Sequence, residues 1–219
     1  MLAKRNVLNV QLNNFPLNQV REFKYLGLIC DESLSWNKHI ERLLVKVGKM
    51  VGFLGRLRRS LNESVVNSVY KALIVPYFDY GDLIYGSAFN KYVDKLQKVQ
   101  NRAARIILRV KPESHVSVAE MHNALGWQFL DKRRHNHTTV FMYKVMHDLT
   151  PAYLQNEFEF APQYYSSRLG EKLLLPKPRT NALKKAFKYR GAKTYNALPP
   201  DLKLCTTVNA FKSKMALDH

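Results

Sequence analysis

The sequence predicts a mainly α-helical protein of the α+β class, with a short antiparallel β hairpin at its N-terminus. Apolar and polar residues alternate near the start of the chain, and from Trp36 onward apolar residues recur at helical steps of three and four. The chain has 219 residues, 46% of them hydrophobic, which is enough to bury a core. We expect three parts: the hairpin over residues 1–31, a helical bundle over 32–112 and a second helical region over 113–219.

The N-terminal part predicts two or three short strands. Residues 7–12 alternate, and Asn13-Asn14 is a turn signal after them. The segment from Phe23 to Ile29 is expected to be the strongest strand. A sheet this small is marginal alone, so we expect it to need the helices behind it or another domain in front of it.

A long amphipathic helix is expected from Trp36 to about Leu57, with Ser35 as its N-cap. A second helix begins after the N-cap Asn62 and ends near Val75. Pro76 begins or kinks a third helix, which continues through residue 85. Asn90 caps a fourth helix over residues 91–110.

The second helical region contains fewer clear boundaries. Ser117-Val-Ala-Glu120 is a capping box for a short helix, and a long helix is expected over residues 131–148. Thr150-Pro151 opens a further short helix. Residues 159–182 are interrupted by prolines and predict a loop or a short extended piece. Two last helices are expected over about 189–197 and 207–217.

The net charge of +18, from 35 Lys and Arg against 17 Asp and Glu, indicates a polyanionic partner, with nucleic acid ahead of an anionic membrane surface. The sequence contains no apolar run of about 18 residues, so we expect no membrane span. It shows no signal peptide. Cys30 and Cys205 lie far apart without a CxxC, which favours a reducing, intracellular compartment, nuclear or cytoplasmic.

Two rows of cations are the best functional signal. One row recurs at steps of four, four and three on the first helix, and the other follows the fourth helix. Such rows can meet successive phosphates of a duplex, although a solvated helix face is the ordinary alternative. The residues are Lys38, Arg42, Lys46 and Lys49 on the first helix, and Lys91, Lys98, Arg102, Arg105 and Arg109 on the fourth.

A third basic cluster has aromatic residues between its cations, which suits single-stranded nucleic acid or ordinary packing. It comprises Lys184, Lys185, Lys188, Arg190 and Lys193, with Phe187, Tyr189 and Tyr195.

Catalytic and metal-binding signals are weak. A two-metal polymerase site needs carboxylates that hold both ions, and the sequence has no adjacent Asp pair. Asp79 and Asp82 are three apart in a helical segment, so we expect helix hydrogen bonding or capping from them. His135 and His137 point about 200° apart on a helix and cannot share a metal. His39 is expected to be structural. With no acid or Cys at ligand spacing from the histidines, we predict no metal site, and we predict no catalytic residue.

Five spaced phrases carry a family resemblance. In the order and spacing in which they occur, they resemble the C-terminal part of reverse transcriptases from non-LTR retrotransposons of the jockey-like group. The phrases are Phe23-Lys-Tyr-Leu-Gly-Leu28, Leu34-Ser-Trp-Asn-Lys-His-Ile40, Val75-Pro-Tyr-Phe-Asp-Tyr-Gly81, Leu96-Gln-Lys-Val-Gln-Asn-Arg-Ala-Ala-Arg-Ile-Ile-Leu108 and Gly191-Ala-Lys-Thr-Tyr-Asn-Ala-Leu-Pro-Pro200.

The resemblance implies a role for each part. The polymerase carboxylates and their Mg²⁺ would belong to a missing palm upstream, so we expect no cofactor here. Residues 1–31 would resemble the end of the palm and the primer grip, with Phe23, Tyr25, Leu26 and Gly27. Residues 32–112 would form a thumb that binds RNA or an RNA–DNA hybrid, and the upstream palm and fingers would be partners. The expected phosphate contacts are Lys38, Arg42, Lys46, Lys49, Lys98, Arg102, Arg105 and Arg109. A protein-interaction module and a retrotransposon relic without function remain alternatives.

Overall fold

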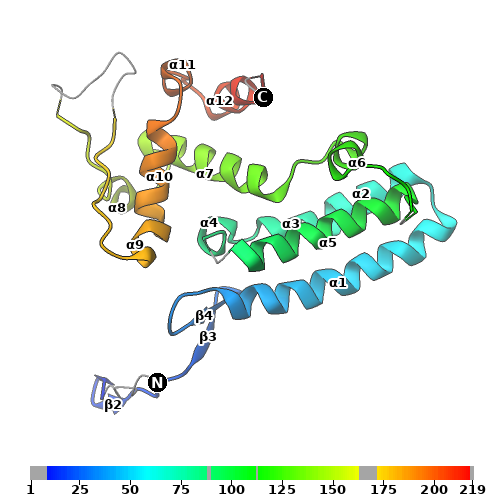
Figure 1. Ribbon diagram of the computed structural model, residues 1–219. Coiled ribbons are helices and arrows are strands. Elements are labelled where there is room, and N and C mark those ends of the chain that lie inside the picture. Colours follow the sequence, from blue (N-terminus) through cyan, green and yellow to red (C-terminus); the bar gives the residue numbers. More distant parts are fainter. Residues whose placement is uncertain (1–8, 88–89, 112, 163–171, 218–219) are drawn as a thin grey trace.

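The computed structural model describes residues 9–87, 90–111, 113–162 and 172–217. Helices make up most of the described chain, and short antiparallel hairpins precede them (Figure 1). The predicted fold class is therefore confirmed. None of the helices in the described ranges combines the length and the hydropathy that a bilayer crossing requires.

Two separate hairpins form the N-terminal part. Strand β1 (Gln11–Leu12) pairs with β2 (Phe15–Pro16), and β3 (Glu22–Tyr25) pairs with β4 (Leu28–Asp31). The first hairpin turns at Asn13 and Asn14, whose φ angles are 50° and 65°, so the predicted turn is confirmed. Asn tolerates this left-handed region better than most residues.

The expected single strand from Phe23 to Ile29 is wrong. The chain reverses at Leu26 and Gly27, with φ angles of 45° and 81°, and returns as β4. Two consecutive positive φ angles match a two-residue hairpin turn that favours Asn-Gly or Asp-Gly. Leu26 stands where Asn or Asp is usual, so the turn carried no familiar sequence signal.

Helix α1 (Asn37–Ser60) begins one residue later than expected, and its N-cap is Trp36. Asp31 organises the preceding turn, because its carboxylate accepts the backbone N–H groups of Ser33, Ser35 and Trp36 at 3.0–3.1 Å. Burial opposes ionisation of Asp31, but the hydrogen bonds from Ser33 and Ser35 together outweigh it and lower its pKa.

The bundle continues through α2 (Glu63–Leu73), α3 (Val75–Asp79), α4 (Asp82–Tyr85) and α5 (Asn90–Leu108). The Asn62 side chain accepts the N–H of Val65 at 2.9 Å, which confirms the predicted N-cap. The prediction of one helix from Pro76 through residue 85 is wrong, because the helix is interrupted at Gly81, whose φ is 72°. A Cβ on Gly81 would lie 2.8 Å from Leu28 Cδ2, so this glycine lets β4 rest on the break.

Helix α6 (Val118–Leu125) packs on α5 at the end of the bundle far from α4 (Figure 1). The remaining helices gather around α7 (Leu130–Met146), which contacts the bundle through α4. They are α8 (Ala152–Gln155), α9 (Asn181–Lys185), α10 (Phe187–Asn196), α11 (Pro200–Lys203) and α12 (Val208–Leu217). Both hydrogen bonds of the predicted capping box at Ser117 and Glu120 are present. In the predicted loop, Phe160 and Leu173 form an antiparallel bridge, while residues 163–171 lie outside the described residues.

Three apolar clusters hold the layers together. The largest joins β4, α1, α2, α5 and α6 and extends to Leu130, at the start of α7. A second cluster places α10 against α7 through Met142, and a third places α12 against α7 through Tyr143 and Phe211. A Cβ on Gly191 would lie 2.5 Å from Met142 Sδ, so glycine permits the close approach of α10.

Candidate nucleic-acid interface

Helices α1 and α5 lie side by side and run in the same direction, so that their C-terminal ends meet (Figure 1). Arg58 donates from Nε to the Ile107 carbonyl at 2.6 Å and from Nη1 to the Leu61 carbonyl at 3.0 Å. Arg109 donates from Nη2 to the Arg58 carbonyl at 2.7 Å. The last carbonyls of a helix lack partners within it, so these guanidinium groups satisfy orphan acceptors and are held in place.

Five arginines surround one shallow hollow of 520 Å³ at this junction. We call it the arginine hollow, and its lining is completed by Gly55, Ile106 and Val110. No ion pair joins any of the five to an acidic residue within the described part of the chain. The acceptors of Arg58 and Arg109 are neutral carbonyls, so the positive charge of these two side chains stays available to an outside anion. The arginines are Arg58, Arg59, Arg102, Arg105 and Arg109.

Arg109 sits in an unusual backbone position. Helix α5 ends at Leu108 and not at Val110 as expected, because Arg109 has a φ of 54°. The Val110 N–H bonds the Arg105 carbonyl at 3.0 Å, and the Arg109 N–H bonds the Ile106 carbonyl at 3.3 Å. This pair of bonds is the Schellman motif, in which Gly is the usual residue at the left-handed position. Here an arginine occupies it and faces the arginine hollow.

The predicted row on α5 leads into this hollow. Lys98, Arg102 and Arg105 are exposed and separated by four and three residues, so they lie on one side of the helix, opposite the buried face that contains Ala103 and Ile107. Sequence reasoning missed Arg58 and Arg59, because only the packing of α1 on α5 brings them to residues about 50 positions later.

The predicted row on α1 faces elsewhere. Lys38 lies 3.6 Å from Glu41, Arg42 forms an ion pair with Glu22, and Lys46 lies 4.2 Å above the Tyr77 ring. Lys49 is exposed. At 100° per residue, the four residues of the row lie about 60–140° around α1 from Arg59, with Lys46 the farthest. Arg42 and Lys46 are thus directed toward β3 and α3, and Lys38 is paired within α1, while the α5 row is reinforced by further arginines.

The four residues of the primer-grip-like hairpin form an exposed tip. Phe23, Tyr25 and Leu26 have 60%, 62% and 71% of their surface exposed, so none of the three side chains belongs to the core. The tip is fixed to the bundle, because Tyr80 Oη donates to the Leu26 carbonyl at 2.5 Å. A Cβ on Gly27 would lie 3.2 Å from Tyr80 Cε1, and its φ of 81° also favours glycine.

The third basic cluster is divided between solvent and core. Phe187 packs edge-on against Phe141 with ring centres 5.3 Å apart, and Tyr195 is buried. Lys188 pairs with Glu157 at 3.0 Å. Phe187 and Tyr195 therefore pack within the protein, which is the second of the two interpretations of this cluster.

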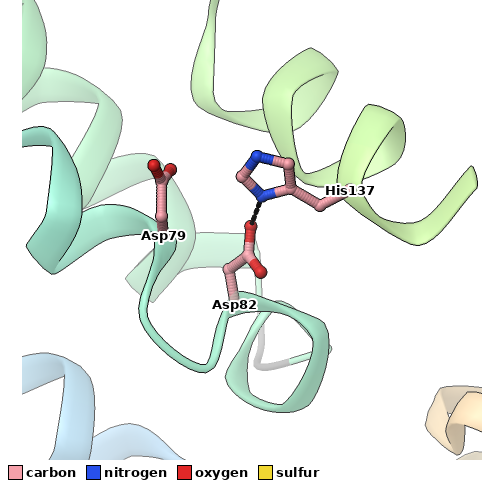
Figure 2. Close-up of side chains that lie close together, drawn as sticks. All are labelled: Asp79, Asp82 and His137. Atoms are coloured by element: carbon pink, nitrogen blue, oxygen red, sulfur yellow. Dashed lines mark hydrogen bonds and ion pairs between the residues drawn. The ribbon is translucent and has the colours of Figure 1, made fainter. Parts of the chain in front are cut away.

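Asp79, Asp82 and His137 come together where α7 crosses α3 and α4 (Figure 2). The expectation of helix hydrogen bonding or capping by the two aspartate side chains is wrong. Arg133 donates from Nε and Nη2 to the two carboxylate oxygens of Asp79 at 2.5 and 2.6 Å. His137 Nδ1 lies 2.6 Å from Asp82 Oδ2. The absence of an acid near the histidines was also a wrong expectation for His137, whose partner is 55 positions away.

One ligand atom from each of Asp79, Asp82 and His137 lies within 4.8 Å of the others, a spacing that suits a metal ion. The carboxylate of Asp79 is already paired with the Arg133 guanidinium, and that of Asp82 is already paired with the His137 ring. Helix α7 places Arg133 and His137 one turn apart, opposite two acids three residues apart. The arrangement works as a two-point clamp that fixes α7 on the bundle.

Two other histidines are structural in the same sense. His39 and His122 are buried, and burial lowers the pKa of each. His39 packs against the Tyr85 ring with centres 5.1 Å apart, as expected of a structural residue. His122 Nε2 lies 3.0 Å from Asn101 Oδ1.

Comparison with known proteins supports the resemblance carried by the five phrases. The chain is 33% identical over 110 residues to the probable RNA-directed DNA polymerase from transposon X-element of Drosophila melanogaster, and 32% identical over 110 residues to the RNA-directed DNA polymerase from mobile element jockey of Drosophila funebris. It is 25% identical over 134 residues to the probable RNA-directed DNA polymerase from transposon BS of Drosophila melanogaster.

The chain is similar to part of a jockey-like RNA-directed DNA polymerase. The matches cover 48% of this chain with X-element and with jockey of Drosophila funebris, and 59% with transposon BS. They span only 12–14% of the length of these relatives. No family model and no solved structure matches the chain.

Proposed function

We propose that this chain is a C-terminal, thumb-like portion of a retrotransposon reverse transcriptase that binds the template–primer duplex through phosphates, without sequence preference. The observation that supports this most strongly is the arginine hollow, where five guanidinium groups gather without an acidic partner among the described residues. RNA or an RNA–DNA hybrid is the proposed partner, and the upstream palm and fingers would hold the hybrid's reacting end.

The physical basis of this binding is counterion release. Each phosphate neutralised by Lys or Arg releases condensed cations, so affinity falls steeply as salt rises. Arg58 and Arg109 are already tied to carbonyl groups, so little side-chain freedom remains to be lost when a phosphate arrives. Arg102 and Arg105 are exposed and can adjust to the duplex.

Fluorescence anisotropy with an RNA–DNA hybrid tests the proposal. If about six phosphates are met, affinity should fall by about 10³-fold between 50 and 200 mM salt. The double variant Arg102→Glu/Arg105→Glu should abolish binding. Lys71→Glu/Lys212→Glu is the matched control, since both lysines are exposed and lie outside the arginine hollow. No binding at low salt, or equal loss in both double variants, would contradict the proposal.

We also propose that the chain alone polymerises nothing, because its two best-placed acids are already engaged by Arg133 and His137. Any Mg²⁺ used for nucleotide addition would be held by the upstream palm. The test is a primer-extension assay with the purified chain, a primed RNA template, Mg²⁺ and all four deoxynucleotides. Extension of the primer would refute this part of the proposal.

A second candidate function, protein interaction, is favoured by one observation. The N-terminal hairpins expose a series of large apolar side chains on the side where an upstream domain would attach. They are Leu12, Phe15, Leu17, Val20, Phe23, Tyr25 and Leu26, each at least 51% exposed. Exposed apolar patches of this kind mark interaction sites. Supplying a palm–fingers polypeptide in trans should protect these residues from hydrogen exchange if the upstream domain is the partner.

A further inference from the structure

A second hollow, of 840 Å³, lies between the N-terminal half of α7, the first turns of α5 and α10. We call it the α7 hollow. It is separate from the arginine hollow and shares none of its lining residues. Four cations face two exposed carboxylates around it: Lys132, Arg134, Arg190 and Lys193 against Asp94 and Asp131.

Two of these cations are held inside with no ion-pair partner among the residues that the structure describes. Arg190 donates from Nη2 to the Leu83 carbonyl at 2.6 Å and from Nε to the Lys185 carbonyl at 2.9 Å, and both acceptors are neutral. Arg134 forms no ion pair within the described ranges. Burial lowers the pKa of both guanidinium groups, and the carboxylates near Arg134 do not outweigh it. Such incompletely compensated charge stabilises an anion that enters the hollow.

The floor of the hollow is shaped to admit Arg134. A Cβ on Gly86 would lie 2.9 Å from Arg134 Cδ, so glycine leaves the space through which this side chain passes. Gln97 does not compete for a ligand, because its side chain already bonds the Leu130 N–H at 2.9 Å and the Gln100 side chain at 2.8 Å.

One wall of the hollow is aromatic. Phe129 stacks on His122 with ring centres 4.5 Å apart and an angle of 19°, and 36% of Phe129 remains exposed. Because His122 covers one ring face, the remaining exposed ring surface can accept a base. Cations beside an aromatic platform are typical of sites that bind single strands. A volume of 840 Å³ is in the range of small-ligand pockets, which suits a nucleotide or two.

We propose that the α7 hollow binds one or two nucleotides of the single strand that adjoins the duplex on α5. The inference rests on the proposed function for the position of the duplex. Asp94 at the hollow precedes Arg109 by 15 positions, which corresponds to about 22 Å along α5 and its end. At 3.4 Å per base pair, that distance accommodates about six base pairs. A duplex lying along α5 would therefore present its single-stranded extension to the α7 hollow.

The test compares a blunt RNA–DNA hybrid with one that carries a single-stranded RNA overhang, by fluorescence anisotropy at fixed salt. Wild-type protein should bind the overhang hybrid about tenfold more tightly, since each stacked base contributes about 1–3 kcal/mol. Lys132→Glu/Lys193→Glu should remove this preference and leave the affinity for the blunt hybrid within a factor of about two, because neither lysine lines the arginine hollow. Lys71→Glu/Lys212→Glu, with the same change in charge, should keep the preference.

The outcomes separate the two proposals. Equal affinity of wild-type protein for blunt and overhang hybrids, or a preference that survives Lys132→Glu/Lys193→Glu, would overturn the inference. Binding of single-stranded RNA that depends on Lys132 and Lys193, without binding of the blunt hybrid, would support the α7 hollow and refute the duplex proposal. Displacement of the overhang by poly-glutamate as effective as by single-stranded RNA would also overturn the inference, because a peptide has no base to stack. If charge reversal prevents folding, Lys132→Gln/Lys193→Gln gives the same comparison.

Discussion

Replacing Arg109 by glycine separates the roles of this residue in stability and in binding. A non-glycine residue in the left-handed region costs about 1–2 kcal/mol, and Arg109→Gly removes that cost. Glycine loses about 0.5–1 kcal/mol through its freedom in the unfolded chain. Loss of the exposed 2.7 Å bond to the Arg58 carbonyl adds about 0.5 kcal/mol, the low end for a hydrogen bond. The free energy of unfolding should therefore change by less than about 1 kcal/mol.

Arg109→Ala is the matched variant, because alanine loses the same cation and the same hydrogen bond but keeps the backbone cost. We expect it to unfold about 1 kcal/mol more easily than Arg109→Gly in urea titrations. Both variants should bind a DNA duplex about eightfold more weakly at 0.1 M salt, with a salt slope smaller by about 0.9, as expected for one lost phosphate contact. Equal stability of the two variants would refute the role of the left-handed turn, and unchanged binding in both would refute the phosphate contact.

Three further predictions follow from other parts of the fold. Asp79→Asn should lower the free energy of unfolding by about 1–3 kcal/mol and speed hydrogen exchange in α7, because an amide can accept only one of the two hydrogen bonds that Arg133 donates to the carboxylate. Lys188→Gln, which loses an exposed ion pair, should cost no more than about 1 kcal/mol. Gly27→Ala should destabilise by about 1–2 kcal/mol in thermal melts, because φ is 81° and Tyr80 lies against the position, and a neutral effect would contradict the turn geometry. The pKa of Asp31 is lowered in the folded state, so the ionised carboxylate should stabilise the fold fully above the unfolded pKa near 3.8. This contribution should be lost as the pH falls from 3.8 through the lower pKa of the folded state. In urea titrations from acid to neutral pH, Asp31→Asn should not show this loss.

The helices could be predicted from the sequence wherever the signals were local. Steps of three and four placed Lys98, Arg102 and Arg105 on one side of α5, and the capping box at Ser117 fixed the start of α6. These features depend on residues within one or two turns of each other, so periodicity and capping chemistry reveal them.

Features that depend on distant segments were not predictable in this way. The arginine hollow joins Arg58 to Arg109, and the clamp joins Asp82 to His137, more than 50 positions apart in each case. Tertiary packing also imposes conformations that the local residue types do not announce. The left-handed turn at Leu26 and the left-handed end of α5 at Arg109 are examples, because neither residue is the Gly, Asn or Asp that normally marks such a position.

The most direct measurement is the salt slope of DNA-duplex binding for wild-type protein and for Arg102→Gln/Arg105→Gln. If both guanidinium groups of the arginine hollow contact phosphates, the slope of log K against log salt should become less steep by about 1.8, while Lys71→Gln/Lys212→Gln leaves it unchanged. A slope in Arg102→Gln/Arg105→Gln equal to that of wild-type protein would contradict the claim that this surface grips a phosphate backbone.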